Sequence, residues 1–176
     1  MNASSPALDG EIRDGRHLMT VRVYYEDTDF SGIVYHANYL RFMERGRTNH
    51  LRLLGAGHRT LFEEAQQEAP GFAFVVRSMQ IEFLKPARMD DVLQVMTAPE
   101  EVKGASITLL QQCRRGEELL CEAHVRVAFI SGGRARPIRR LCAACSWTTA
   151  CRRSWPVRWR RAASASTTAP TSSTRP

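Results

Sequence analysis

Residues 24–39, YYEDTDFSGIVYHANY, mark the passage from a strand into a long helix. Apolar and polar side chains alternate over residues 18–27, which predicts a half-buried strand with Val21, Val23 and Tyr25 on its apolar side. Residues 27–34 hold Asp, Ser and Gly, a composition typical of a loop. Apolar side chains then recur at three- and four-residue steps over residues 37–54, which predicts an amphipathic helix of about five turns.

The rest of the ordered chain is predicted to form strands at residues 72–83, 92–97, 106–114 and 119–130, after a short second helix at residues 58–69. A change of phase near Arg77 and Ser78 predicts a bulge in the first of these strands. In the last strand, Leu119 and every second residue after it are expected to face the core. Short connections favour an antiparallel sheet covered by one helix, an α+β domain. Because one helix cannot cover five strands, a partner subunit is expected.

The net charge of +7, from 25 basic and 18 acidic residues, suggests a nucleic-acid partner. The distribution of the charge contradicts this idea. Residues 1–133 hold 15 basic and 18 acidic side chains, a net charge of −3, whereas residues 134–176 hold ten arginines and no acidic residue. We interpret this irregular tail as the product of a frameshift near residues 137–140, the alternative being a natural disordered basic tail. No nucleic-acid partner is predicted.

Residues 1–17 are polar and mixed in charge, which predicts a disordered leader without a signal peptide and therefore a cytoplasmic location. Apolar runs stay below the roughly 18 residues that a membrane-spanning helix needs. The five cysteines are an odd number, which argues against a disulfide framework. Cys142 and Cys145 have the spacing of metal ligands but lack further ligands nearby, so no metal site is predicted.

The chemistry is expected where the loop meets the long helix. A helix N-terminus has free backbone N–H groups, which polarise a carbonyl and hold an oxyanion. Asp29 precedes the expected helix start at His36 by seven residues and, folded back over it, can act as nucleophile or base. Gly32 allows the close turn that this requires. We interpret Asp27 as structural, because two adjacent carboxylates raise one another's pKa.

Three strings of residues in this order closely resemble hotdog-fold acyl-CoA thioesterases of the 4-hydroxybenzoyl-CoA thioesterase type, in the branch associated with the Tol-Pal system. They are D-x-D-x-x-G-x-V-x-H-x-N-Y at residues 27–39, F-V-V-R-x-M at residues 74–79 and F-x-K-P-A-R-x-D-D at residues 83–91. The resemblance implies a hotdog domain over residues 18–133, with about five antiparallel strands wrapped around one long central helix. It also implies homodimers that pair into tetramers, with active sites between subunits.

The resemblance further implies roles for individual residues. Asp29 is expected to be catalytic, the backbone N–H at His36 to polarise the thioester carbonyl, and the side chains of His36 and Tyr25 to contribute. Substrate-binding residues are expected at Gly32, Val34, Asn38, Lys85 and Arg88, the two basic ones by gripping phosphates. No cofactor is expected, since coenzyme A is part of the substrate. Core packing of Tyr25, a local role of Asn38 and solvation of the basic pair remain alternatives.

The leading interpretation is hydrolysis of acyl-CoA thioesters to free acid and CoA, with acyl-carrier-protein thioesters as further substrates. A hotdog dehydratase is disfavoured, because the chain lacks the His-Phe-Pro and Asn-Pro-x-His signatures of those branches. A module that binds acyl-CoA or an acyl carrier protein without catalysis stays open as the alternative. The preferred acyl chain and the choice between dimer and tetramer also stay open.

Overall fold

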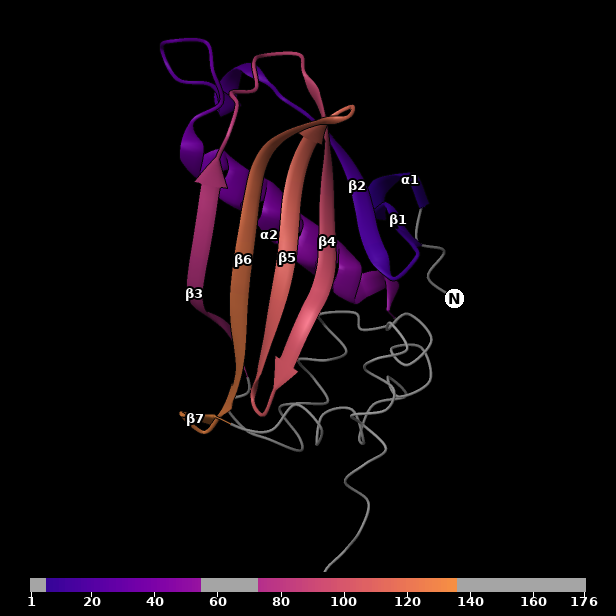
Figure 1. Ribbon diagram of the computed structural model, residues 1–176, viewed down its shortest axis with the longest axis vertical. Coiled ribbons are helices and arrows are strands. Elements are labelled where there is room, and N and C mark those ends of the chain that lie inside the picture. The colour runs from indigo at the N-terminus through magenta and orange to yellow at the C-terminus, as the bar shows by residue number, and fades with distance from the viewer. Residues whose placement is uncertain (1–5, 55–72, 136–176) are drawn as a thin grey trace, which may run out of the picture.

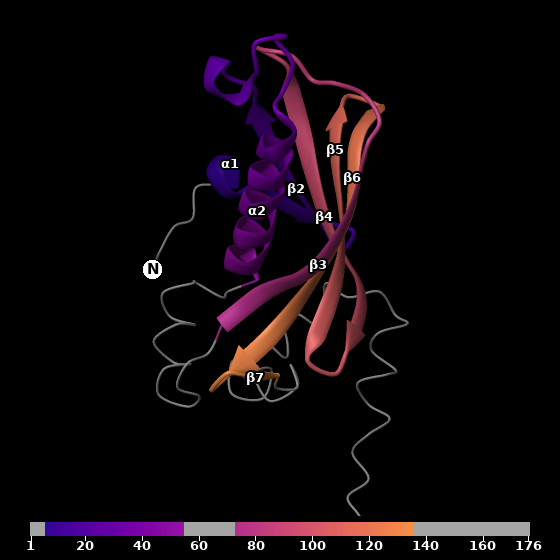
Figure 2. The ribbon, with the colours of Figure 1, turned by 90° about the vertical axis from the view of Figure 1, so that its left-hand side faces the viewer.

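The long helix α2 (His36–Leu53) crosses one face of a twisted antiparallel sheet (Figures 1 and 2). The computed structural model describes residues 6–54 and 73–135. The other elements are, in chain order, α1 (Pro6–Asp9), β1 (Glu11–Arg13), β2 (Arg16–Arg22), the 3-10 helix η1 (Tyr25–Asp27), β3 (Ala73–Phe83), β4 (Val92–Lys103), β5 (Ser106–Arg115), β6 (Glu118–Ser131) and β7 (Arg134–Ala135).

The sheet has the strand order β1-β2-β4-β5-β6-β3, with β7 beside β6, and every pairing is antiparallel. Its five long strands are those that the alternating patterns predict, so the α+β architecture is confirmed. The predicted bulge is also confirmed, because the β3–β6 register shifts between Val76 and Ser78. The predicted helix at residues 58–69 and the tail from residue 136 lie outside the described residues.

The core lies between α2 and the sheet. The helix buries residues that recur at three- and four-residue steps, as its periodicity predicts: Tyr39, Phe42, Met43, Gly46 and His50. The sheet contributes fully buried residues such as Leu93, Val95, Cys113, Leu120 and Val125. Burying one large apolar side chain stabilises a fold by about 1.5–3 kcal/mol, so this contact holds α2 in place.

Gly46 is the position where α2 comes very close to the sheet. A Cβ added there would lie 2.9 Å from Thr97 Oγ1 and 3.3 Å from Val95 Cγ1. Thr97 is fixed in turn by the buried Gln111, whose Nε2 donates to Thr97 Oγ1 (2.8 Å) and to the backbone carbonyl of Met43 (2.9 Å). A missing side chain and two hydrogen bonds therefore set the position of the helix on the sheet.

Replacing Gly46 with valine is expected to lower the free energy of unfolding by about 1–3 kcal/mol, because overpacking forces neighbours out of place. Thr97 cannot yield without losing its hydrogen bond to Gln111. Urea unfolding measures the loss. Arg41→Val places the same residue at an exposed site of α2 and is expected to cost only tenths of a kcal/mol. Equal stability of the two variants would contradict the close contact.

The predicted strand over residues 18–27 is correct only as far as Arg22. The Asp27 carboxylate accepts a hydrogen bond from the Tyr24 N–H (2.9 Å), and the Asp27 N–H donates to the Tyr24 carbonyl (3.0 Å). Such side-chain-to-backbone bonds compete with strand pairing and produce a turn. Tyr25 therefore lies in η1 with 83% of its surface exposed, and the alternative that it packs in the core is wrong.

The prediction of a disordered leader is wrong for residues 6–17, which form α1, β1 and the start of β2. Asp9 is buried and pairs with Arg52 (Nη1 to Oδ1, 2.7 Å). His17 is also buried, its Nε2 donates to the Asp9 carbonyl (2.7 Å), and its ring stacks on His50 with centroids 5.6 Å apart. The polar composition that suggests disorder thus belongs to residues paired with the distant end of α2.

Leu119 is half-buried rather than part of the core, whereas Leu120 is fully buried. The β5–β6 pairing places Cys113 opposite Cys121 and Arg114 opposite Leu119, so Leu120 is an extra residue in β6. This bulge turns Leu120 inward, and a strict alternation cannot show it.

Candidate active site

The loop before α2 is built around Asp27. Its carboxylate accepts a hydrogen bond from the Tyr24 N–H, while its backbone carbonyl accepts hydrogen bonds from the Tyr35 N–H (2.9 Å) and from Asn38 Nδ2 (2.9 Å). Asp27 is buried, and its contacts lie on both sides of the loop. The interpretation of Asp27 as a structural carboxylate agrees with these contacts.

Asp29 opens a tight turn within this loop. Its Oδ1 accepts the Ser31 N–H (2.8 Å), its carbonyl accepts the Gly32 N–H (3.0 Å), and its own N–H donates to the Ile33 carbonyl (2.9 Å). Gly32 has φ +71°, a left-handed conformation that favours glycine, and open space surrounds its Cα. Across residues 6–54 and 73–135, nothing donates a hydrogen bond to Asp29 Oδ2. One carboxylate oxygen is therefore free for chemistry.

The base of the turn lies next to the start of α2. Thr28 is paired with Val34, two residues before His36, so the chain folds back on itself. Tyr35 is the N-cap, its side chain makes no capping hydrogen bond, and the first turn of α2 contains no acidic residue. The N–H groups of His36 and Ala37 have no acceptor within the described chain. The helix thus presents free donors and its partial positive charge beside the turn.

The side chains of His36 and Tyr25 both reach the surface. The His36 ring lies 4.3 Å from that of Tyr35 and 6.3 Å, edge-on, from that of Phe83. The Tyr25 carbonyl accepts hydrogen bonds from the Thr28 N–H (3.1 Å) and hydroxyl (2.9 Å), which fixes η1. A site role for either side chain stays a prediction.

Val34 and Asn38, both predicted to bind substrate, have side chains that serve the fold. Val34 is buried in the core, and its N–H donates to the Ala87 carbonyl (2.9 Å). Asn38 is buried, and its side-chain amide donates a hydrogen bond to the Asp27 carbonyl. Of the predicted substrate-binding residues in this loop, Gly32 alone is exposed.

The β3–β4 connection, residues 84–91, docks on the same region. The Ala87 N–H donates to the hydroxyl of Tyr39 (2.9 Å), a buried tyrosine whose pKa burial raises. Arg88 is paired with Ile33 through the backbone, so the connection lies against the Asp29 turn. The anchoring role of Tyr39 was missed, because its partner lies 48 residues away in the chain.

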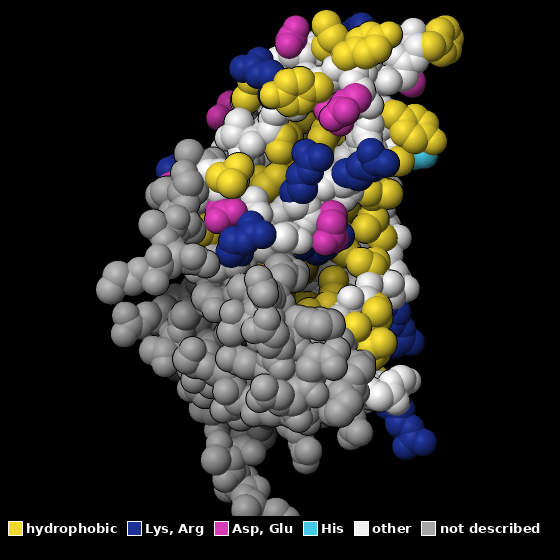
Figure 3. All heavy atoms as spheres, turned by 180° about the vertical axis from the view of Figure 1, so that it is seen from behind, with side chains coloured by type: hydrophobic (Ala, Val, Ile, Leu, Met, Phe, Trp, Pro, Cys, Tyr) yellow, Lys and Arg dark blue, Asp and Glu magenta, His cyan; other side chains and the backbone are white. Residues whose placement is uncertain are grey.

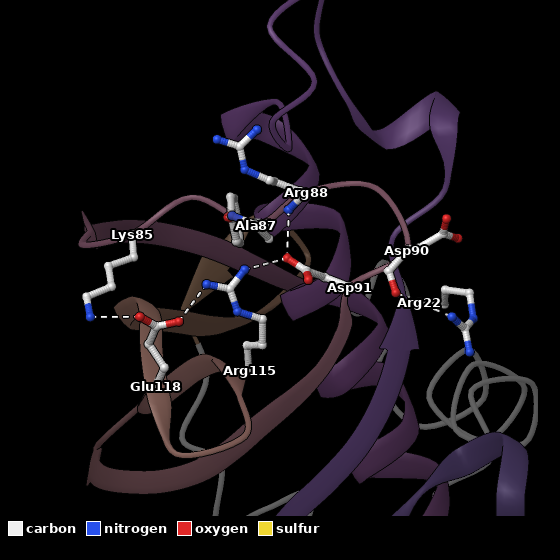
Figure 4. A network of polar contacts seen from close by, with 9 residues as sticks. Arg22, Lys85, Ala87, Arg88, Asp90, Asp91, Arg115 and Glu118 are labelled. Carbon is white, nitrogen blue, oxygen red and sulfur yellow. Dashed lines mark hydrogen bonds and ion pairs between the residues drawn. The ribbon is translucent and has the colours of Figure 1, made fainter.

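The two basic residues of this connection differ in their surroundings (Figure 4). Lys85 Nζ lies 2.7 Å from Glu118 Oε1 and is therefore already paired with a carboxylate. Arg88 is exposed, and its guanidinium has no hydrogen bond or ion pair in the described ranges. Arg88 is thus the better placed of the two for an anionic ligand.

Hydrophobic side chains gather at the end of the molecule that carries this loop (Figure 3). The exposed ones in the loop, at the end of β3 and in the connection after it are Tyr24, Tyr25, Phe30, Tyr35, Phe83, Leu84 and Met89. An exposed apolar surface of this kind usually contacts a partner or a ligand.

Neither a metal site nor a membrane-spanning helix is found in the described ranges. Residues 6–54 and 73–135 contain no group of three His, Cys, Asp or Glu side chains arranged to hold a metal ion. Of the helices in the same ranges, none is long and apolar enough to cross a membrane. The independence from cofactors stays a prediction.

Comparison with known proteins identifies the family. The profile of the thioesterase-like superfamily matches residues 23–153. The acyl-CoA thioesterase YbgC of Haemophilus influenzae is 47% identical over 125 residues, which cover 71% of this chain and 88% of that protein. The acyl-CoA thioester hydrolase YbgC of Escherichia coli O157:H7 is 42% identical over 118 residues, 66% of this chain and 84% of that protein.

Solved structures of thioesterases have the same fold. A probable thioesterase from Bartonella henselae matches with a TM-score of 0.64 and 40% identity, covering 69% of this chain and 98% of that one. The 4-hydroxybenzoyl CoA thioesterase from Pseudomonas sp. strain CBS-3 has a TM-score of 0.60 at 23% identity over 74% of this chain and 99% of that one, which shows the shared fold.

A twisted antiparallel sheet laid against one long helix is a hotdog fold, and the relatives that match it are thioesterases. The chain belongs to the thioesterase-like superfamily. The matched range continues past residue 133, where the domain is predicted to end, and both that boundary and the frameshift stay predictions.

Proposed function

We propose that this chain hydrolyses acyl-CoA thioesters to a free carboxylic acid and CoA, with Asp29 and the start of α2 as the reacting site. The observation that carries the proposal is the Asp29 turn, which leaves one carboxylate oxygen free beside the unpaired N–H groups of His36 and Ala37. The relatives named as acyl-CoA thioesterases support the choice of substrate class.

Two chemical routes fit this arrangement. Asp29 can take a proton from water, whose oxygen attacks the thioester carbonyl; collapse of the intermediate then expels the thiolate of CoA, which is protonated. Alternatively, Asp29 attacks directly, the thiolate leaves, and water hydrolyses the resulting mixed anhydride. In both routes the N–H groups at His36 stabilise the oxyanion that forms on the carbonyl oxygen. The side chains of Tyr25 and His36, both exposed at this end, contact the substrate.

Phosphate recognition falls mainly to Arg88. A guanidinium without a carboxylate partner can bind a phosphate through paired hydrogen bonds, whereas the charge of Lys85 is already balanced by Glu118. Lys85 therefore contributes less than Arg88 to binding of the CoA phosphates.

The working form is a homo-oligomer, a dimer or tetramer, that covers the apolar end of the molecule. The exposed aromatic side chains of the loop before α2 and the outer edge of β3, which has no neighbouring strand among the described residues, support association. Acyl carrier protein is a further candidate substrate carrier. The cytoplasmic location and the link to the Tol-Pal system stay predictions.

The purified wild-type protein is expected to release thiol from at least one member of a panel of acyl-CoAs with short aliphatic, long aliphatic and aryl groups. A spectroscopic thiol assay measures the release, and the same acyl groups on acyl carrier protein test the second carrier. Binding of acyl-CoA without thiol release would instead identify a binding module. No release from any substrate would contradict the proposal.

A further inference from the structure

A chain of charged contacts joins the β3–β4 connection to the turn between β5 and β6 (Figure 4). Lys85 Nζ lies 2.7 Å from Glu118 Oε1, and Glu118 Oε2 lies 2.6 Å from Arg115 Nη2. Arg115 Nη1 in turn lies 2.6 Å from Asp91 Oδ2. We call the last contact the Asp91–Arg115 bridge.

Asp91 also binds the backbone of Arg88. The same oxygen, Oδ2, accepts the Arg88 N–H at 2.8 Å, and the Asp91 N–H donates to the Arg88 carbonyl at 3.1 Å. Between them Asp90 has φ +66°, a strained conformation for a residue other than glycine. Such a conformation persists where surrounding contacts hold it, and here the two hydrogen bonds between Asp91 and the backbone of Arg88 close the turn.

The guanidinium of Arg88 takes no part in this network. It points away from Asp91 and Arg115 (Figure 4) and has no hydrogen bond or ion pair with any described residue. The carboxylates of Asp91 and Glu118 are occupied by Arg115 and Lys85. The network therefore fixes the backbone of Arg88 while leaving its positive charge unbalanced, beside the turn of Asp29.

We propose that Asp91 and Arg115 are positioning residues that present Arg88 to a phosphate group of the thiol carrier. The bridge sets the affinity for the phosphate-bearing part of the substrate and leaves the cleavage step unaffected. This inference rests on the proposed function of the Asp29 site. The phosphate can belong to CoA or to the phosphopantetheine arm of an acyl carrier protein, since both carry it on the same thiol arm.

The test compares acyl-CoA with acyl-pantetheine, which has the same thiol arm but no phosphate. Arg88→Ala is expected to raise KM for acyl-CoA about tenfold, the loss of one charge-assisted contact, with kcat and the constants for acyl-pantetheine unchanged. Asp91→Ala is expected to raise the same KM severalfold, and Asp91→Asn less, because the amide oxygen can still accept the Arg88 N–H. Acyl-4′-phosphopantetheine shows whether the single phosphate of that arm is enough for Arg88→Ala to raise KM.

The double variant separates positioning from general stability. If Asp91 acts through Arg88, Asp91→Ala adds nothing to KM once Arg88 is alanine. Glu101→Ala, which breaks the exposed Glu101–Lys103 pair (2.8 Å), is the matched control. It is expected to leave KM and kcat for both substrates unchanged. Additive effects, or equal effects on acyl-CoA and acyl-pantetheine, would overturn the inference.

Calorimetric binding of CoA and pantetheine keeps the test independent of turnover. A protein that binds CoA through Arg88 and the bridge but releases no thiol would contradict the proposed function and support the inference. A normal CoA preference in Asp91→Ala, together with a lost preference in Arg88→Ala, would overturn the inference alone.

Discussion

Asp29→Asn is expected to lower kcat for acyl-CoA hydrolysis by about 10²–10⁴-fold, the usual contribution of a positioned acid–base group, with KM little changed. Asparagine has the same shape, and its side-chain oxygen can still accept the Ser31 N–H that forms the turn. It has no negative charge, so it can neither take a proton from water nor attack a carbonyl. Steady-state thiol release by the purified variant measures the effect.

The matched control is Asp14→Asn, the same chemical change at an exposed position of the β1–β2 turn. Asp14 has φ 51°, a conformation that asparagine tolerates well, so the fold should not suffer. Its kcat is expected to equal that of the wild type. If Asp29→Asn also retains the wild-type rate, Asp29 is not the catalytic carboxylate.

Acidification is expected to destabilise the protein through His50. Burial lowers the pKa of His50 from 6.5 to about 4, with the neighbouring His17 acting in the same direction. Between these two values the unfolded chain binds more protons than the folded one. The contribution of neutral His50 to the free energy of unfolding is therefore fully present above pH 6.5 and is lost as the pH falls toward 4. A shift of this size corresponds to roughly 3 kcal/mol of unfolding free energy.

His17 adds to the same trend, because burial lowers its pKa as well, against the opposing effect of the Asp9 carbonyl. Its Nε2 donates to that carbonyl, and its buried Nδ1 has no hydrogen-bond partner among the described residues. Protonation would therefore place a charge where no acceptor is available. The contacts that tie α1 and β1 to the end of α2 are expected to weaken first.

Urea unfolding measured at a series of pH values between 4 and 7 tests this prediction. His50→Phe removes the titrating group and is expected to flatten the dependence. His124→Gln, a change at a half-buried histidine of β6, is expected to leave it as steep as in the wild type. A wild-type stability that stays constant down to pH 4 would contradict the burial of a neutral His50.

The sequence predicts those parts of the structure that depend on local periodicity. The helix α2, the five long strands and the bulge at Val76–Ser78 each follow from the spacing of apolar side chains. The helix start at His36 is confirmed as well, whereas the catalytic role of Asp29 stays a prediction. For these features, contacts with distant residues strengthen the local preference and do not overrule it.

The remaining features depend on partners that a linear pattern does not show. The polar, mixed-charge composition of residues 1–17 predicts a disordered leader, yet Arg52 and His50 make the burial of Asp9 and His17 favourable. Lys85 is predicted to grip phosphates or to be solvated, and the sequence does not show its ion pair with Glu118, which lies 33 residues later.

The close contact at Gly46 also limits how the site can be redesigned. A helix that touches the sheet without an intervening side chain, and is tied to it by Gln111, can neither slide nor rotate by a useful amount. The N–H groups at His36, which we propose to bind the oxyanion, are therefore at a fixed position relative to the strands. Within the described residues, the loop of residues 24–35 and the connection of residues 84–91 lie around this helix start without being part of the fixed contact, which makes these two segments the first sites to randomise in a library.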